Sequence, residues 1–209
     1  MTTLVIGANG QIGKQFCERA QKAGEPVKAM VRREEQTGWF AERGIDTVVA
    51  DLEGDFSHAF DGCEQVVFTA GSGPDTGPDK TLMIDLYGAI RAAGIAAEKG
   101  LKRFIMVSAM RAEDPMTAPE KLRPYMAAKF AADAHLRLSP LPHVILKPGR
   151  LSDDAATELF AASVDEAGDN RISRANVACA LLYAVQHAVL ENTEFTLLDG
   201  TRSAAEVMA

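Results

Sequence analysis

The fold is decided by the stretch Gly7-Ala8-Asn9-Gly10-Gln11-Ile12-Gly13. It follows a β-branched run at residues 3–6 and opens a segment whose apolar residues recur every three or four positions, as on one face of a helix. Glycine at the first, fourth and seventh positions lets a strand turn tightly into a helix, lets a phosphate approach the backbone, and lets the helix pack closely. The free N–H groups at the helix start add a partial positive charge. The stretch therefore predicts a phosphate-binding turn between a strand and a helix.

Beyond this turn, short apolar runs alternate with segments of helical period, which is typical of parallel strands joined by helices. We expect strands at residues 4–6, 27–31, 47–50, 65–70, 104–107, 143–146 and 195–198, and helices at 83–97, 125–138 and 177–190. The predicted fold class is α/β, a Rossmann-type doubly wound parallel sheet in one domain over residues 1–209. Its cofactor-binding core would span residues 1–150, and a small C-terminal substrate-side extension would span 151–209. Such a sheet binds a dinucleotide at the carboxyl ends of its strands.

Composition and charge disfavour several other classes of function. The 209 residues suffice for one well-buried core, and the net charge of −7 argues against nucleic acid, which needs a basic surface. Three separated cysteines and four histidines without ligand spacing predict neither a disulfide framework nor a metal site. The chain shows no signal-peptide pattern, and its apolar stretch at 177–190 is shorter than the roughly 20 residues of a membrane span. We expect a cytoplasmic protein that binds a small-molecule substrate and no membrane; its oligomeric state stays open.

Two arginines, Arg32 and Arg33, follow the second predicted strand, where an NAD-binding site usually places a carboxylate against the ribose 2′-hydroxyl. A guanidinium can bind a 2′-phosphate through two hydrogen bonds, whereas a carboxylate repels it. We therefore expect NADP(H) as the preferred cofactor. NAD(H) is the alternative, because Glu34 and Glu35 follow directly and exposed arginines are common after a strand.

A second group of residues indicates chemistry beside the cofactor. Ser108 ends the fifth predicted strand, and Tyr125 and Lys129 lie one turn apart on the same face of the following helix. Tyr125 can donate a proton to a developing alkoxide, Lys129 can hold the cofactor ribose, and Ser108 can donate a hydrogen bond to the substrate oxygen. Because a free tyrosine has a pKa of about 10, we expect the charge of Lys129 to lower it toward neutrality. The alternative is an amphipathic helix with a rim tyrosine and a solvated lysine.

The first gap between the glycines is one residue longer than in Gly-x-Gly-x-x-Gly. The chain also contains Ser108, Tyr125-x-x-x-Lys129 and Pro148-Gly149. Together they resemble an atypical short-chain dehydrogenase/reductase of the NAD(P)-binding, NmrA-like and epimerase-like branch. The resemblance covers residues 2 to about 150 and, more loosely, the remainder.

The resemblance implies a set of cofactor-binding residues beyond the two arginines. It places the adenine between Asp51 and Leu52, the nicotinamide-side ribose along Ala70, Gly71 and Ser72, and the nicotinamide beside Pro148 and Gly149. The pyrophosphate would lie on the turn formed by Gly7, Asn9, Gly10, Gln11, Ile12 and Gly13. Asp85 stands where many relatives carry a catalytic asparagine, so its role is left open.

These residues predict an NADP(H)-dependent oxidoreductase that transfers hydride to or from a small carbonyl or alcohol substrate. Two alternatives stay open: a non-catalytic NmrA-like regulator that senses NADP(H), and an epimerase or dehydratase that recycles its hydride internally. The chain is shorter than epimerases of the extended branch, which disfavours a bulky nucleotide-sugar. Long loops at 71–78 and 111–124 follow carboxyl ends of strands, so we expect them to contact cofactor and substrate. No pattern in them identifies the substrate.

Overall fold

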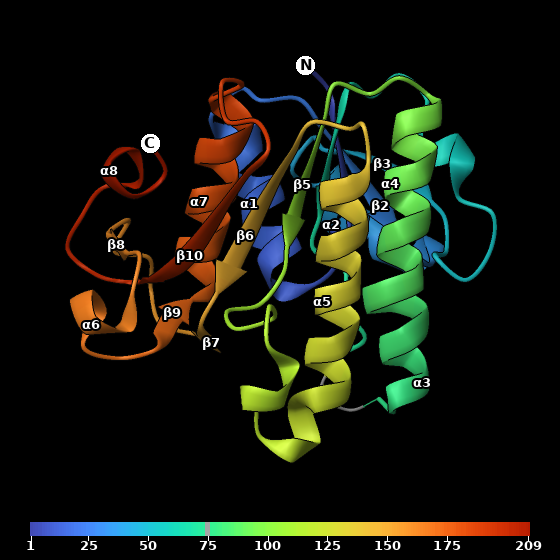
Figure 1. Cartoon of the computed structure of the whole chain (residues 1–209). Helices are drawn as coiled ribbons and strands as arrows, with labels where there is room; N and C mark the ends of the chain where they lie inside the picture. The colour runs from blue at the N-terminus through green and yellow to red at the C-terminus, as the bar shows by residue number, and fades with distance from the viewer. Residues whose placement is uncertain (74–75) are drawn as a thin grey trace.

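The computed structural model describes residues 1–73 and 76–209. Its main feature is an eight-stranded sheet in the order β3-β2-β1-β4-β5-β6-β10-β8, in which all neighbours are parallel except β10 and β8 (Figure 1). These strands are β1 Thr3–Ile6, β2 Val27–Val31, β3 Asp46–Val49, β4 Gln65–Phe68, β5 Arg103–Val107, β6 His143–Pro148, β8 Phe160–Ala161 and β10 Thr193–Asp199. A small second sheet pairs β7 (Arg150–Ser152) with β9 (Arg171–Ser173). The predicted Rossmann-type α/β fold is confirmed.

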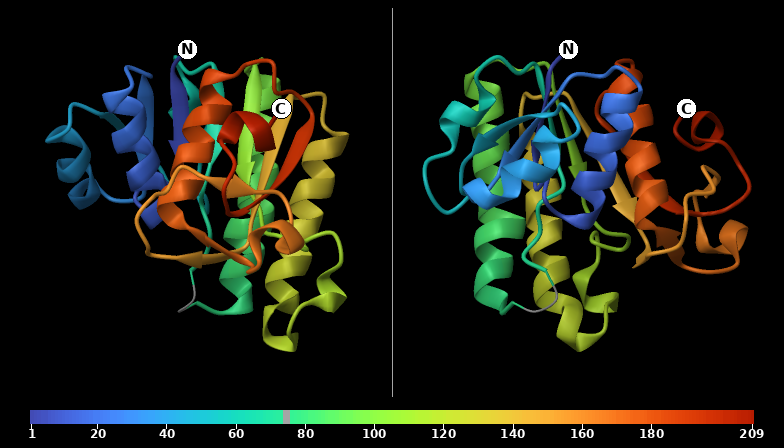
Figure 2. Two further views of the ribbon diagram at one scale, coloured as in Figure 1. Left: turned by 90° about the vertical axis from the view of Figure 1, so that its left-hand side faces the viewer. Right: turned by 180° about the vertical axis from the view of Figure 1, so that it is seen from behind.

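Helices cover both faces of the sheet (Figures 1 and 2). On one face α1 (Gln11–Lys22) packs against α7 (Arg174–Gln186), and on the other α4 (Ala89–Glu98) packs against α5 (Arg123–Leu138). The remaining helices are short: α2 Thr37–Ala41, α3 Pro78–Lys80, α6 Val164–Ala167 and α8 Ala204–Val207. None of the helices in the described part of the chain has the length and apolar character that a membrane crossing requires.

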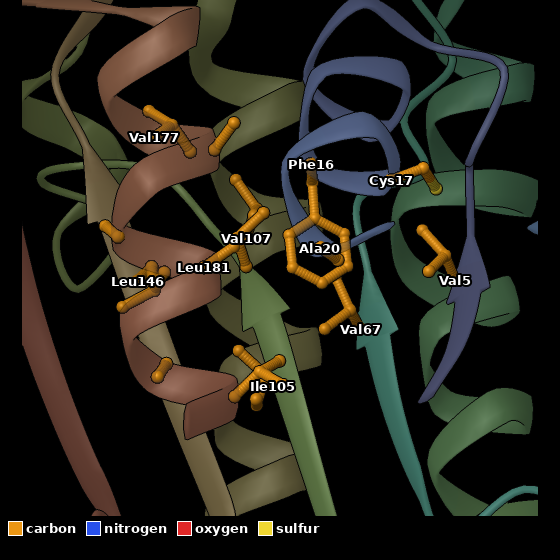
Figure 3. Close-up of a cluster of buried hydrophobic side chains, with 14 of the residues drawn as sticks. Val5, Phe16, Cys17, Ala20, Val67, Ile105, Val107, Leu146, Val177 and Leu181 are labelled. Atoms are coloured by element: carbon orange, nitrogen blue, oxygen red, sulfur yellow. The ribbon is translucent and has the colours of Figure 1, made fainter. Parts of the chain in front are cut away.

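Two buried clusters of side chains hold these layers together. Successive strand residues point to opposite faces of a sheet, so a strand covered on both faces is apolar throughout. In β5, Ile105 joins the cluster under α1 and α7, and Phe104 joins the cluster under α4 and α5. Figure 3 shows the first cluster, in which Phe16 of α1 lies next to Val67 of β4. Helices and strands are thereby fixed relative to one another.

The helix before β5 differs from the prediction. The sequence predicted a helix over 83–97, but the chain is helical from Pro78 to Glu98, and its segment Thr81–Gly88 is a π-helix between α3 and α4. The wider turns of a π-helix interrupt the helical period, and they often occur at functional sites. Helix α5 begins two residues earlier than predicted, because Pro124 suits the first turn, where a missing N–H costs nothing.

The predicted ligand loops are only partly regular. The loop at 111–124 contains two 3-10 turns, η4 Pro115–Thr117 and η5 Glu120–Leu122. In the loop at 71–78, Pro74 and Asp75 lie outside the described residues. Two further 3-10 turns are η1 Glu34–Gln36, after β2, and η2 Ser57–Phe60, before β4. The sequence predicted neither these turns nor β7, β8, β9 and α6, because elements of two to four residues show no periodicity.

The strand register brings the ends of β1, β4 and β5 into one row. Ile6 pairs with Phe68, and Phe68 pairs with Met106. The residues that follow each strand therefore meet at one carboxyl edge, which is where open parallel sheets bind ligands.

Candidate functional site

The glycine turn has the close backbone contacts that its sequence predicts. Gly7 has a φ of +86°, and a Cβ added there would lie 2.4 Å from the backbone nitrogen of Ala70. A Cβ at Gly13 would lie 2.4 Å from the carbonyl oxygen of Gly7. Gly10 is the N-cap of α1, and no side chain of the described residues caps the helix there. The first turn of α1 therefore offers its N–H groups to an anion.

A groove of about 370 Å³ opens beside this turn along the carboxyl edge. Its lining includes nine of the predicted cofactor-binding residues: Gly7, Asn9, Gly10, Arg32, Asp51, Leu52, Ala70, Gly71 and Ser72. Its lining also includes Gln36 and Lys80, which the sequence analysis did not assign to the cofactor. The oxygen Oε1 of Gln36 accepts hydrogen bonds from the backbone N–H groups of Arg32 and Arg33 at 2.9 and 3.1 Å. Gln36 therefore fixes the chain where the second strand ends.

Charges of both signs border the groove. Arg32 is exposed and lines it, whereas Arg33 lies outside it, with its Nε 4.0 Å from the carboxylate of Glu35. The Nζ of Lys80 lies 2.6 Å from the carboxylate of Glu53, and both residues line the groove. This ion pair links the loop after β3 to the start of the long helix. No local sequence pattern predicts this ion pair, because Glu53 and Lys80 are far apart in the sequence.

The other predicted cofactor residues lie outside the groove lining. Gln11 and Ile12 are in the first turn of α1, and Ile12 packs against the core under α1 and α7. Pro148 is buried at the end of β6. A Cβ at Gly149 would lie 2.2 Å from the carbonyl oxygen of Asn170, so this glycine allows the C-terminal segment to approach β6.

Ser108, Tyr125 and Lys129 gather at the same edge, next to the groove but outside its lining. The Nζ of Lys129 donates a hydrogen bond of 3.1 Å to the carbonyl of Val107, the residue before Ser108. It lies 5.8 Å from the ring centroid of Tyr125. The side chains of Ser108 and Lys129 are buried, and Tyr125 is half-buried.

Two buried carboxylates that sequence reasoning did not assign complete this group. Asp85 lies on the π-helical segment, where its Oδ1 is 3.6 Å from the Nζ of Lys129 and its Oδ2 accepts a hydrogen bond of 2.9 Å from the N–H of Ser72. Asp133 lies one turn after Lys129 on α5 and accepts a hydrogen bond of 2.8 Å from the hydroxyl of Ser108. A helical spacing of four from Lys129 could have indicated Asp133. The position of Asp85 depends on the π-helix, which the sequence did not predict.

The expected shift of the Tyr125 pKa is wrong in direction. Burial raises the pKa of Tyr125, and the opposing effect of Lys129 is smaller. Burial disfavours the charge on Lys129, but the pKa of Lys129 is nevertheless raised by its interactions with Tyr125, Asp85 and Asp133. Tyr125 therefore keeps its proton, and Lys129 keeps its charge, at neutral pH.

The described residues contain no group of three or more histidine, cysteine, aspartate or glutamate side chains that could hold a metal ion. The available chemistry is that of a dinucleotide groove with a phenol, an ammonium, a hydroxyl and two carboxylates at one end.

The fold and this edge define a dinucleotide-binding protein of Rossmann type. The chain belongs to the NAD(P)H-binding family, whose model matches residues 7–188. It is 41% identical over 213 residues to YhfK of Bacillus subtilis, described as an uncharacterized sugar epimerase, with 100% of this chain and 99% of that protein covered. It is 33% identical over 169 residues to the UPF0659 protein YMR090W of Saccharomyces cerevisiae, with 77% and 74% covered.

A solved structure agrees with this family. The structure of a putative NAD-dependent epimerase/dehydratase from Bacillus halodurans superposes with a TM-score of 0.93 at 40% identity and covers 100% of this chain and 98% of that one. The resemblance to an NAD(P)-binding, epimerase-like family is confirmed.

Proposed function

We propose that the protein is an NADP(H)-dependent oxidoreductase that exchanges hydride with a small carbonyl or alcohol substrate. The proposal is based mainly on one observation. The buried ammonium of Lys129 is held between the ring of Tyr125 and the strand end that carries Ser108, at the edge where the groove opens. Placing a charged lysine inside the protein requires compensating partners, and here those partners are the groups that a proton-transfer site needs.

The residues present fit a dinucleotide. The missing side chains at Gly7 and Gly13 allow the backbone to approach a pyrophosphate, and the groove has a volume typical of a cofactor site. Buried Leu52 and Met30 supply apolar surface for a base at one end of the groove. When bound, NADPH supplies the hydride.

The residues of the chain would handle the accompanying proton. Because its pKa is raised, Tyr125 holds a proton at neutral pH and can donate it to the oxygen of a carbonyl undergoing reduction. The carbonyl of Val107 and the carboxylate of Asp85 orient Lys129, whose charge stabilises the tyrosinate that remains. A raised tyrosine pKa favours proton donation by Tyr125 over proton removal.

Purified protein with NADPH and a panel of aldehydes, ketones and quinones tests this proposal. Replacing Tyr125→Phe removes the proton donor, and we expect kcat/KM to fall about 100-fold or more, as for loss of a general acid. Tyr87→Phe is the matched control, because Tyr87 is half exposed and lies on the outer side of the π-helical segment. Absence of turnover on the whole panel, or equal activity of the Tyr125→Phe variant, would overturn the proposal.

The preference for NADP(H) rests on Arg32. This side chain lines the groove and can reach a 2′-phosphate, whereas Arg33 lies outside the groove. We expect Arg32→Ala to raise the Kd for NADPH about 10- to 100-fold, the effect of losing a charge-assisted hydrogen bond. The Kd for NADH should change less than threefold, and Arg33→Ala should change neither. Calorimetric titration of both cofactors measures these values; equal losses for NADPH and NADH would contradict the preference.

A second candidate is an epimerase or dehydratase, favoured by the descriptions of YhfK and the Bacillus halodurans protein. Both match this chain over nearly their whole length, so a short chain is compatible with those descriptions. An enzyme that returns its hydride to the substrate consumes no net NADPH and usually retains its cofactor. A purified protein that carries bound cofactor and converts a hydroxylated substrate without net change in absorbance at the NADPH band would favour this candidate over the reductase.

A further inference from the structure

The hydroxyl of Ser108 is committed to a partner inside the protein. Its oxygen lies 2.8 Å from Oδ2 of Asp133, and both side chains are almost fully buried, with 3% and 1% of their surface exposed. A serine hydroxyl has one proton and two lone pairs. When Asp133 is ionised, the only available donor between these two groups is Ser108, so its proton points at Asp133 and away from any substrate.

The surroundings of Asp133 fit a carboxyl group that also exists in its neutral form. Its second oxygen, Oδ1, is buried without a hydrogen-bond partner among the described residues. An ionised carboxylate with an unpaired buried oxygen is costly, whereas a neutral acid is far less so. The ammonium of Lys129 is directed to Asp85 and the carbonyl of Val107 instead.

Charges on several elements face Asp133 from farther away. Lys129 and Arg137 lie on its own helix, and Lys147 lies on β6, where it is 2.7 Å from the carboxylate of Glu194 and 3.5 Å from that of Glu113. Asp85 and Tyr125 also interact with Lys129. Burial raises the pKa of Asp133 to about 6, against the smaller effects of Ser108 and these cations. The neutral and the ionised form are therefore both populated near neutral pH.

We propose that Asp133 is a positioning residue that sets the direction of the Ser108 hydrogen bond and thereby the kind of oxygen that the site accepts. Neutral Asp133 donates its own proton to Ser108, and the serine proton is then free to point at a carbonyl or alkoxide oxygen. Ionised Asp133 holds the serine proton, and the hydroxyl can only accept a hydrogen bond, for example from a substrate alcohol. One proton from solvent is bound or released by Asp133, and Ser108 keeps its own throughout. The role of Ser108 toward the substrate rests on the proposed function.

The hydrogen bond itself is tested without any turnover. In protein labelled with ¹³C at aspartate Cγ, the Asp133 resonance is identified by its loss in Asp133→Asn and titrated against pH. We expect its midpoint to lie well above that of exposed aspartates and to rise by about one pH unit or more in Ser108→Ala, because the variant loses a donor that stabilises the carboxylate. A midpoint that does not respond to Ser108→Ala would overturn the inference.

The consequence for the reaction is tested by pH profiles of kcat/KM in both directions. In the wild type, carbonyl reduction should decline above the Asp133 midpoint while alcohol oxidation increases. The amide of Asp133→Asn donates a hydrogen bond to Ser108 at every pH, so the decline of reduction above the midpoint should disappear. The ratio of the reduction rate to the oxidation rate at pH 8 should rise about tenfold. Asp46→Asn, at an exposed position on the edge strand β3, should retain the wild-type profile. If the decline of carbonyl reduction seen in the wild type persists in Asp133→Asn, the inference is overturned. A protein without any turnover overturns the proposed function instead, and the carbon titration then decides the inference alone.

Discussion

The glycine at position 13 provides a sharp test of how the dinucleotide turn is built. A Cβ there would lie 2.4 Å from the carbonyl oxygen of Gly7 and 2.8 Å from Cα of Ala8, whereas ordinary contact begins at 3.4 Å. Both neighbours are backbone atoms and cannot rotate away, so α1 and the turn must separate by about 1 Å. Because the clash is with backbone atoms, such overpacking costs about 2–3 kcal/mol, the upper part of the usual range, and the better helix propensity of alanine returns about 1 kcal/mol. We expect Gly13→Ala to lose about 1–2 kcal/mol of unfolding free energy.

Thermal unfolding and cofactor titration measure this effect. For a chain of this size the loss corresponds to a Tm lower by about 2–8 °C. Because the turn that we expect to receive the pyrophosphate has moved, the Kd for NADP(H) should also rise at least about tenfold. Gly94→Ala in α4 is the matched control: nothing lies within 4 Å of its added Cβ, so only the propensity gain remains and the Tm should increase slightly. A Gly13→Ala protein as stable as the wild type, with unchanged affinity, would refute the close-packing argument.

Two pH-dependent effects on stability have opposite signs. The pKa of Glu194 is lowered to about 2, chiefly by its hydrogen bond from Arg137 and also by Lys147, so its stabilising effect is present above its ordinary pKa and is lost as the pH falls toward 2. In urea unfolding between pH 5 and 2, Glu194→Gln should therefore lose less stability than the wild type, and a parallel loss would contradict this. The pKa of Asp133 is raised to about 6, so the folded state loses stability as the pH rises through that value. The unfolding free energy of the wild type should therefore decrease by about 2 kcal/mol between pH 4 and 8, and Asp133→Asn should remove this decrease. If the variant retains the decrease, another group causes it.

The layers of the fold could be predicted because they depend on local patterns. A strand buried on both faces is apolar at each residue, and the runs around Val5, Val67 and Ile105 show this without any knowledge of their neighbours. The row formed by Gly7, Ser72 and Ser108 also follows, since each comes shortly after a parallel strand. The short elements between β6 and α7 could not be predicted, because they are held by contacts such as that of Gly149 with Asn170 and not by periodicity.

The electrostatics of the site were predicted less well than its location. The spacing of Tyr125 and Lys129 correctly indicated that they share a helix face, but the direction of the Tyr125 pKa shift depends on burial, which sequence alone does not give. Arg32 and Arg33 are adjacent in the sequence and equivalent as charges, yet only Arg32 lines the groove. The orientation of the chain after β2 decides between them, and Gln36 fixes that orientation.

The two buried carboxyl groups, Asp85 and Asp133, have different partners around Lys129. Asp85 accepts a hydrogen bond from the N–H of Ser72, beside the groove, and pairs with Lys129, so the π-helical segment connects the loop after β4 to Lys129. A Cβ at Gly71 would lie 3.1 Å from Asp85, so the glycine leaves the space that this carboxylate occupies. With the ammonium committed to Asp85, Asp133 has Ser108 as its hydrogen-bond partner.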